Sequence, residues 1–178
     1  KENSGSYLPD TFFNKKNFSY LKCENCSLIY LHPLPLEEDY IAMYPPTYQS
    51  GINATLINEN KKMPGLRFPY KKHFDLINRF APKGRILDYG CGQANFLINA
   101  KQAGFVCDGT EYNSDHLEVL KKEIKGSEFY LINDFLKNEI LKYDVIRLSN
   151  VLEHLDRPHE IIKDLCAKLN TGGVLLVE

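Results

Sequence analysis

The residues whose types and spacing could do chemistry begin with Asp88, Gly90, Cys91 and Gly92, within segment 85–96. A short apolar run ends in the acid, two glycines follow, and the next residues can start a helix. The pattern predicts a strand, a tight turn and a helix N-terminus. Glycines remove side chains where a ligand approaches the backbone, and the helix start offers amide groups and a partial positive charge. The turn is therefore a candidate cradle for the polar part of a nucleotide-like cofactor.

Two classes of cofactor site use such a turn. Dinucleotide-binding Rossmann proteins require Gly-x-Gly-x-x-Gly, and Asn95 stands at the third glycine position. The segment fits Asp-x-Gly-x-Gly instead, and it resembles motif I of class I S-adenosylmethionine-dependent methyltransferases. That resemblance implies that Gly90, Cys91 and Gly92 border the methionine part of S-adenosyl-L-methionine. It also implies that Asp88 orders the turn and reaches the cofactor's ammonium, directly or through water.

An acid follows the second predicted strand. Glu111 lies 19 residues after Gly92, where a carboxylate can accept both ribose hydroxyls of an adenosine. A dehydrogenase would place its acid similarly, so Glu111 does not choose between the two classes. The methyltransferase resemblance further implies that Tyr112 lies against the adenine or packs, and that Asp134 binds the adenine amino group. Phe135 would offer a backbone N–H to the ring.

Two later segments, 143–155 and 169–178, resemble the strand-4 and strand-5 signatures of the same family. The resemblance places Asn150 near the transferred methyl group. His154 is a candidate general base, because histidine titrates near neutral pH. Ubiquinone-pathway O-methyltransferases have a similar Glu-His pair that holds a divalent metal with an upstream acid, but Asn150 stands at that upstream position. Alternatively, Glu153 and His154 anchor the helix that follows.

Cys23 and Cys26 form a Cys-x-x-Cys at a predicted hairpin tip. Two thiolates on one tight turn supply half of a tetrahedral zinc site. Segment 23–35 resembles the second half of the N-terminal zinc ribbon of type 12 and type 23 small-molecule methyltransferases, with Ser27 in place of glycine. The first half would precede Lys1. We expect a metal-free hairpin in this chain, with structural zinc only where upstream ligands exist.

Strands and helices alternate along the rest of the chain, which predicts a mostly parallel, Rossmann-like α/β sheet with helices on both faces. The family sheet has seven strands, so we expect this one to be truncated after strand 5. We predict an N-terminal appendage at 1–48, a linker or lid at 49–65 and a cofactor-binding domain at 66–178. The expected strands are 18–22, 27–31, 85–89, 105–110, 129–132, 143–148 and 174–177, and the expected helices are 36–43, 68–80, 93–103, 114–125 and 157–169.

Composition limits the partners of the 178-residue chain. Its net charge is −1 with no basic block, which argues against nucleic acid, and no long apolar run predicts a membrane span. Five cysteines without a secretion signal indicate reduced thiols and a cytoplasmic protein. We expect methyl transfer from S-adenosylmethionine to a small-molecule acceptor. The alternatives are an NAD-type Rossmann oxidoreductase and a non-catalytic cofactor-binding module.

Overall fold

The structure is a computed structural model that describes residues 8–43, 54–62, 70–81, 84–155 and 157–178. The chain divides into two compact units, Lys1–Tyr48 and Gln49–Glu178. None of the helices formed by the described residues is long and apolar enough to cross a membrane.

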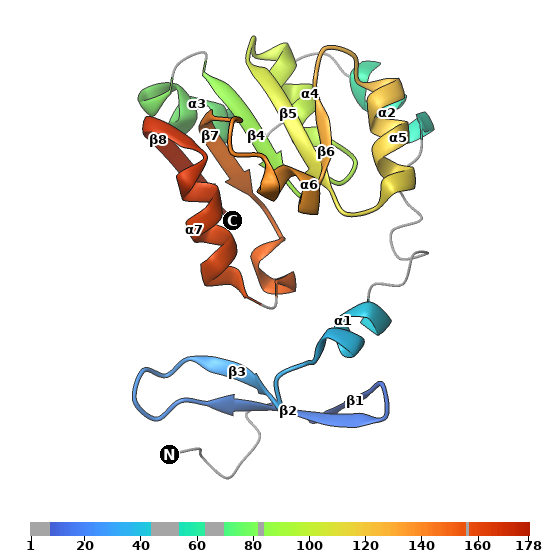
Figure 1. The fold of residues 1–178 in the computed structure, drawn as a ribbon, viewed down its shortest axis with the longest axis vertical. Coiled ribbons are helices and arrows are strands. Elements are labelled where there is room, and N and C mark those ends of the chain that lie inside the picture. Colours follow the sequence, from blue (N-terminus) through green and yellow to red (C-terminus); the bar gives the residue numbers. More distant parts are fainter. Residues whose placement is uncertain (1–7, 44–53, 63–69, 82–83, 156) are drawn as a thin grey trace. The chain divides into compact units, whose positions relative to one another are not determined.

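The first unit is a three-stranded antiparallel sheet followed by a short helix (Figure 1). Its elements are β1 (Thr11–Phe13), β2 (Lys16–Lys22), β3 (Ile29–His32) and α1 (Glu37–Met43). Asn14 and Lys15 have φ of 46° and 63°, which makes a two-residue hairpin turn whose twist matches the strands. The predicted strands 18–22 and 27–31 correspond to β2 and β3, which pair, and the predicted helix 36–43 corresponds to α1.

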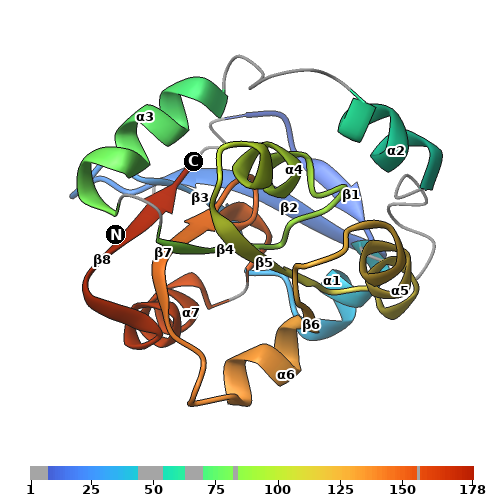
Figure 2. The same ribbon diagram turned by 90° about the horizontal axis from the view of Figure 1, so that it is seen from above.

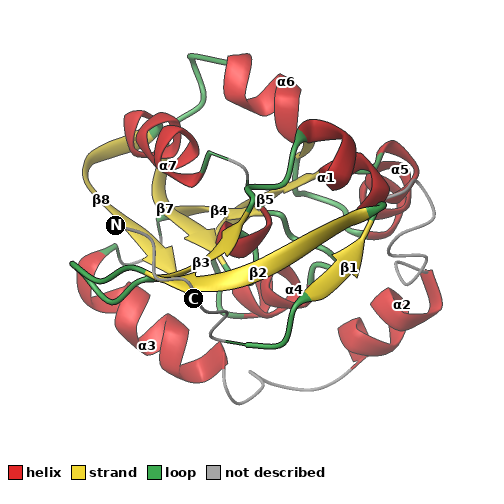
Figure 3. Ribbon diagram, turned by 90° about the horizontal axis from the view of Figure 1, so that it is seen from below, coloured by secondary structure: helices red, strands yellow, loops and turns green. Residues whose placement is uncertain are grey.

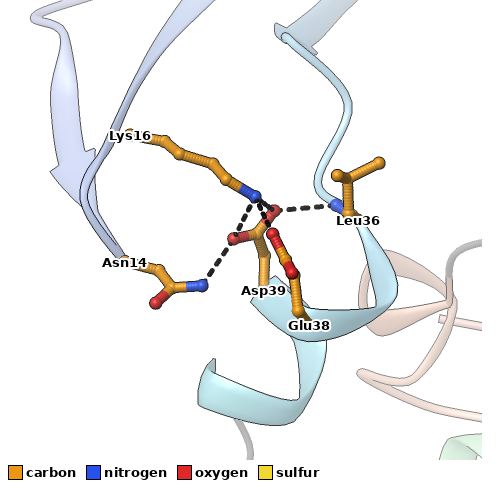
Figure 4. A network of polar contacts seen from close by, with 5 residues as sticks. All are labelled: Asn14, Lys16, Leu36, Glu38 and Asp39. Atoms are coloured by element: carbon orange, nitrogen blue, oxygen red, sulfur yellow. Dashed lines mark hydrogen bonds and ion pairs between the residues drawn. The ribbon is translucent and has the colours of Figure 1, made fainter.

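Asp39 joins the hairpin to the start of α1 (Figure 4). Its side chain is completely buried, and its Oδ1 accepts from Asn14 Nδ2 at 2.7 Å. Its Oδ2 accepts from the backbone N of Leu36 at 2.8 Å, and Lys16 Nζ donates to both oxygens. One carboxylate thus caps the helix and ties it to the β1–β2 turn.

The second unit is built on a five-stranded parallel sheet with the order β6-β5-β4-β7-β8 (Figure 1). This confirms the predicted Rossmann-like class. The strands are β4 (Arg85–Tyr89), β5 (Val106–Glu111), β6 (Phe129–Leu131), β7 (Tyr143–Leu148) and β8 (Leu169–Val177). The helices are α2 (Ala54–Lys62), α3 (Tyr70–Phe80), α4 (Asn95–Gln102), α5 (Ser114–Glu123), α6 (Ile132–Lys137) and α7 (Pro158–Ala167).

Helices cover both faces of this sheet (Figures 2 and 3). On one face α2, α3, α4 and α5 enclose a core that includes Phe74, Phe96 and Ile86. On the other face α6 and α7 pack on a core that includes Leu87 and Phe135. Because successive strand residues point to opposite faces, the apolar strands read as continuous hydrophobic runs.

Three segments differ from the sequence prediction. The segment 49–65, predicted as a linker or lid, contains a helix: its residues 54–62 form α2 with a completely buried Ile57, and the rest of the segment lies outside the described residues. Residues 170–173 separate the expected helix 157–169 from the expected strand 174–177, yet they lie within β8, where a register irregularity follows Leu169. Strand 129–132 ends at Leu131, because α6 begins at Ile132.

Candidate cofactor-binding site

The glycine turn follows β4 and is anchored on β5. Gly90 has φ +74° and Gly92 has φ +50°, which L side chains rarely adopt. A Cβ on Gly90 would lie 2.7 Å from Val151 Cγ2. The N–H of Gly90 donates to Thr110 Oγ1 at 3.0 Å, and the N–H of Cys91 donates to Thr110 O at 2.9 Å. The neighbouring strand therefore fixes the position of the turn.

Helix α4 begins directly after this turn without a side-chain cap. Its N-cap is Ala94, in the left-handed region with φ 54°, and this residue makes no side-chain cap hydrogen bond. A Cβ on Gly92 would meet nothing within 4 Å. The turn thus leaves open space beside a helix N-terminus, which is what an approaching polar ligand requires.

Cys91 turns its thiol into the protein. A Cβ on Gly109 would lie 2.7 Å from its Sγ, so the thiol packs directly on the backbone of β5. Burial, followed by the charges of Asp88 and Glu111, raises the pKa of Cys91 well above its usual value. The thiol is therefore a poor nucleophile, and the backbone of Cys91 is the part directed to the turn.

Asp88 lies beneath the turn in an ion pair that the sequence did not reveal. Its side chain is 3% exposed, and Arg147 Nη1 donates to its Oδ1 at 2.9 Å. Arg147 Nη2 donates to Glu178 Oε2 at 2.6 Å, and its guanidinium lies 4.3 Å from the centre of the Phe96 ring. Burial raises the pKa of Asp88 to about 6, although Arg147 opposes that shift. The sequence signal was Arg147, a charged residue that follows the apolar Val145 and Ile146 within β7.

Glu111 closes β5 at the same edge of the sheet, because β4 and β5 are parallel neighbours. Its side chain is 6% exposed, and its Oε1 accepts from the N–H of Asn113 at 3.3 Å. His116, which carried no usable pattern in the sequence, places Nδ1 3.9 Å from the same oxygen. Tyr112 is 69% exposed, so its ring does not pack in the core. Helix α5 is capped by Asn113 and not by Ser114, although serine is also a favoured N-cap residue.

The residues predicted for the adenine lie after β6, in helix α6. Asp134 is exposed and contributes to an open pocket of about 380 Å³ together with Leu117, Phe129 and Leu131. The ring of Phe135 is completely buried on the opposite side of its helix, in the core below the sheet. Asp134 and the apolar pocket are therefore adjacent, while Phe135 has only its backbone left for a ligand.

The residues predicted for catalysis follow β7. Asn150 is exposed in the left-handed region, with φ 51°, and its N–H donates to Glu178 O at 3.3 Å. His154 ends a short 3-10 helix, Leu152–His154, and its side chain is 43% exposed. Its Nε2 lies 3.8 Å from Glu153 Oε1. In the described part of the chain, no group of three His, Cys, Asp or Glu side chains could hold a metal here.

Cys23 and Cys26 belong to the first unit, on the connection between β2 and β3. The backbone amides of Cys26 and Asn25 lower the pKa of Cys23, which favours its thiolate. Within the described ranges, no further His, Cys, Asp or Glu completes a metal site with this pair. The pair supplies two of the four ligands that structural zinc requires.

Comparison with known proteins agrees with this geometry. Residues 66–178 match the family described as "Methyltransferase domain". The chain is 31% identical over 101 residues to the ubiquinone biosynthesis O-methyltransferase of Actinobacillus pleuropneumoniae (strain L20), over 51% of this chain and 43% of that protein. It is 27% identical over 103 residues to the enzyme of the same name from Glaesserella parasuis, over 52% of this chain and 44% of that protein. The match thus spans less than half the length of these relatives.

Solved structures share the fold. SAM-bound CalS10, an amino pentose methyltransferase from Micromonospora echinaspora, superposes with a TM-score of 0.52 at 18% identity, over 71% of this chain and 56% of that chain. The CcbJ methyltransferase from Streptomyces caelestis gives 0.51 at 16% identity, over 68% and 54%. Together with the match over 66–178, the glycine turn and the parallel sheet lead to one conclusion: the chain belongs to the methyltransferase-domain family.

Proposed function

We propose that the chain binds S-adenosylmethionine and transfers its methyl group to a small-molecule acceptor. The observation that carries this proposal is the pairing of an open, left-handed glycine turn with a buried carboxylate at the end of the next strand. The relatives' name, ubiquinone biosynthesis O-methyltransferase, and the cofactor-bound state of CalS10 support it. The free thiols of all five cysteines support a reducing, cytoplasmic setting.

The residues at the carboxyl edge of the sheet fit this cofactor. The backbone of Gly90, Cys91 and Gly92 borders the methionine part, since no side chain fills the space at Gly92. Glu111 accepts from the ribose hydroxyls. Asp134 receives the adenine amino group beside its apolar pocket, with Tyr112 against the ring and the Phe135 N–H toward it. Asp88 orders the glycine turn from the end of β4, and its Oδ1 already accepts a hydrogen bond from Arg147.

Methyl transfer from this cofactor requires mainly that the acceptor, the methyl group and the sulfur are aligned. The cofactor supplies a methyl group on a cationic sulfur, which is already a good leaving group. The chain must hold the acceptor in line and take up a proton if the acceptor carries one. Asn150 lies at the end of β7, where it can orient the acceptor, and exposed His154 is the candidate base. Glu153 and His154 lack a third ligand among the described residues, so no step is assigned to a metal.

Isothermal titration calorimetry tests the proposal. We expect S-adenosylmethionine and S-adenosylhomocysteine to bind and NAD to give no heat. Glu111→Gln is expected to weaken binding by roughly 10- to 100-fold, because the loss of a charged acceptor costs about 1.5–3 kcal/mol. Glu128→Gln is the matched control, since Glu128 is an exposed carboxylate that precedes β6, at the opposite end of that strand from the pocket residue Asp134. Binding of NAD in place of both sulfur compounds would instead support an oxidoreductase, and binding without turnover on any acceptor a non-catalytic module.

A further inference from the structure

His116 is a buried side chain that the proposed chemistry does not use. Its side chain is 10% exposed, and its Nδ1 has no hydrogen-bond partner. Buried polar groups are nearly always paired, and an unpaired one destabilises a protein by about 1–3 kcal/mol. Glu111 Oε1, at 3.9 Å, is the nearby acceptor that faces this nitrogen. The pair therefore needs an explanation beyond packing.

The local backbone brings these two side chains together. Glu111 ends β5, and Asn113 caps α5 by accepting from the N–H of Asp115 at 2.8 Å and of His116 at 3.2 Å. The N–H of Asn113 in turn donates to Glu111 Oε1 at 3.3 Å. The cap thus folds the first turn of α5 back over the end of the strand. These backbone hydrogen bonds fix the point on α5 from which the imidazole of His116 extends toward Glu111.

Glu111 directly follows Thr110, the residue of β5 whose carbonyl and hydroxyl oxygens accept from the N–H groups of Cys91 and Gly90. Glu111 therefore lies beside the glycine turn at the edge of the sheet, and its charge contributes to the raised pKa of Cys91 after burial and the charge of Asp88. Its Oε1 is directed to Asn113 and His116. The second oxygen, Oε2, is the one left for a ligand at the turn.

We propose that His116 is a positioning residue for Glu111. With the proton on Nδ1, the imidazole donates to Oε1 once the carboxylate rotates to close the 3.9 Å gap. Oε1 is then held from behind by two donors, and Oε2 is aimed at the vicinal hydroxyls of the ribose. This inference rests on the proposed function, because the ribose is that of S-adenosylmethionine. It adds a residue whose contribution to cofactor affinity runs entirely through Glu111.

Variants at position 116 separate the position of the donor from simple packing. Asparagine places an amide nitrogen where Nδ1 lies, glutamine places it where Nε2 lies, and leucine has no donor. We expect His116→Asn to bind S-adenosylhomocysteine within about threefold of the wild type, and His116→Gln and His116→Leu to bind about tenfold more weakly. Thermal melts without ligand report the folding of each variant. A purely structural role predicts that affinity follows the melting temperature instead.

A double-mutant cycle with Glu111→Gln completes the test. If His116 acts through Glu111, His116→Leu has no further effect on the dissociation constant in the Glu111→Gln background. An equal loss in both backgrounds, or a loss in His116→Asn as large as in His116→Gln, overturns the inference while the proposed function stands. A folded wild-type chain that does not bind S-adenosylhomocysteine overturns both. The Asn and Gln variants alone decide the matter if His116→Leu does not fold.

Discussion

Asp88 is a buried carboxylate whose charge destabilises the folded protein, and this can be measured. Its pKa is raised from 3.8 to about 6, chiefly by burial, while Arg147 opposes the shift and the charge of Glu178 adds to it. A shift of about 2 units corresponds to about 3 kcal/mol. Because the folded-state pKa is the higher one, the stabilising contribution is complete below pH 3.8 and is lost as the pH rises through 6.

Replacement of Asp88 by asparagine removes the charge and keeps the shape, and its amide oxygen can still accept from Arg147. We expect the free energy of unfolding of Asp88→Asn, relative to the wild type, to rise by roughly 1 kcal/mol between about pH 5 and about pH 7.5. Arg147→Met has the opposite effect, because it leaves a buried carboxylate unpaired. It should lower stability by about 3–5 kcal/mol at neutral pH.

Urea unfolding followed by circular dichroism at several pH values measures these differences. Asp75→Asn is the matched control, since Asp75 is an exposed carboxylate on α3 and its replacement should leave the pH profile unchanged. The reasoning is refuted if Asp88→Asn loses as much stability as Arg147→Met at neutral pH. It is also refuted if the difference between Asp88→Asn and the wild type does not change with pH.

Three further outcomes follow from the structure. Gly90→Ala should lose cofactor binding and about 1–3 kcal/mol of stability by urea unfolding, because its φ is +74° and the new Cβ would lie 2.7 Å from Val151. Alkylation read by mass spectrometry should label Cys23 early, since nearby amides lower its pKa, and buried Cys91 last, since its pKa is raised. The hydrogen bonds to Asp39 lower its pKa, so the first unit should lose stability as the pH falls below the usual range of an aspartate, and Asp39→Asn should abolish that dependence in amide-exchange measurements.

Most of the fold could be predicted from the sequence because its signals are local. Strands 85–89 and 143–148 have the predicted bounds, since each is a short apolar run closed by turn residues. The glycine turn could also be predicted, because Gly90 and Gly92 adopt positive φ, a backbone conformation for which glycine is the favoured residue type. The parallel sheet followed from the alternation of strands and helices.

Contacts between distant residues were decided only by the tertiary structure. Asp88 meets Arg147 because β4 and β7 are neighbours with those two residues in register, and the sequence states neither fact. Segment 54–62 is polar enough to resemble a linker, yet burial of Ile57 against the core makes it a helix. His116 reaches Glu111 because Asn113, and not Ser114, caps α5. Periodicity and turn chemistry act within a few residues along the chain, whereas charge pairing depends on which elements lie side by side in space.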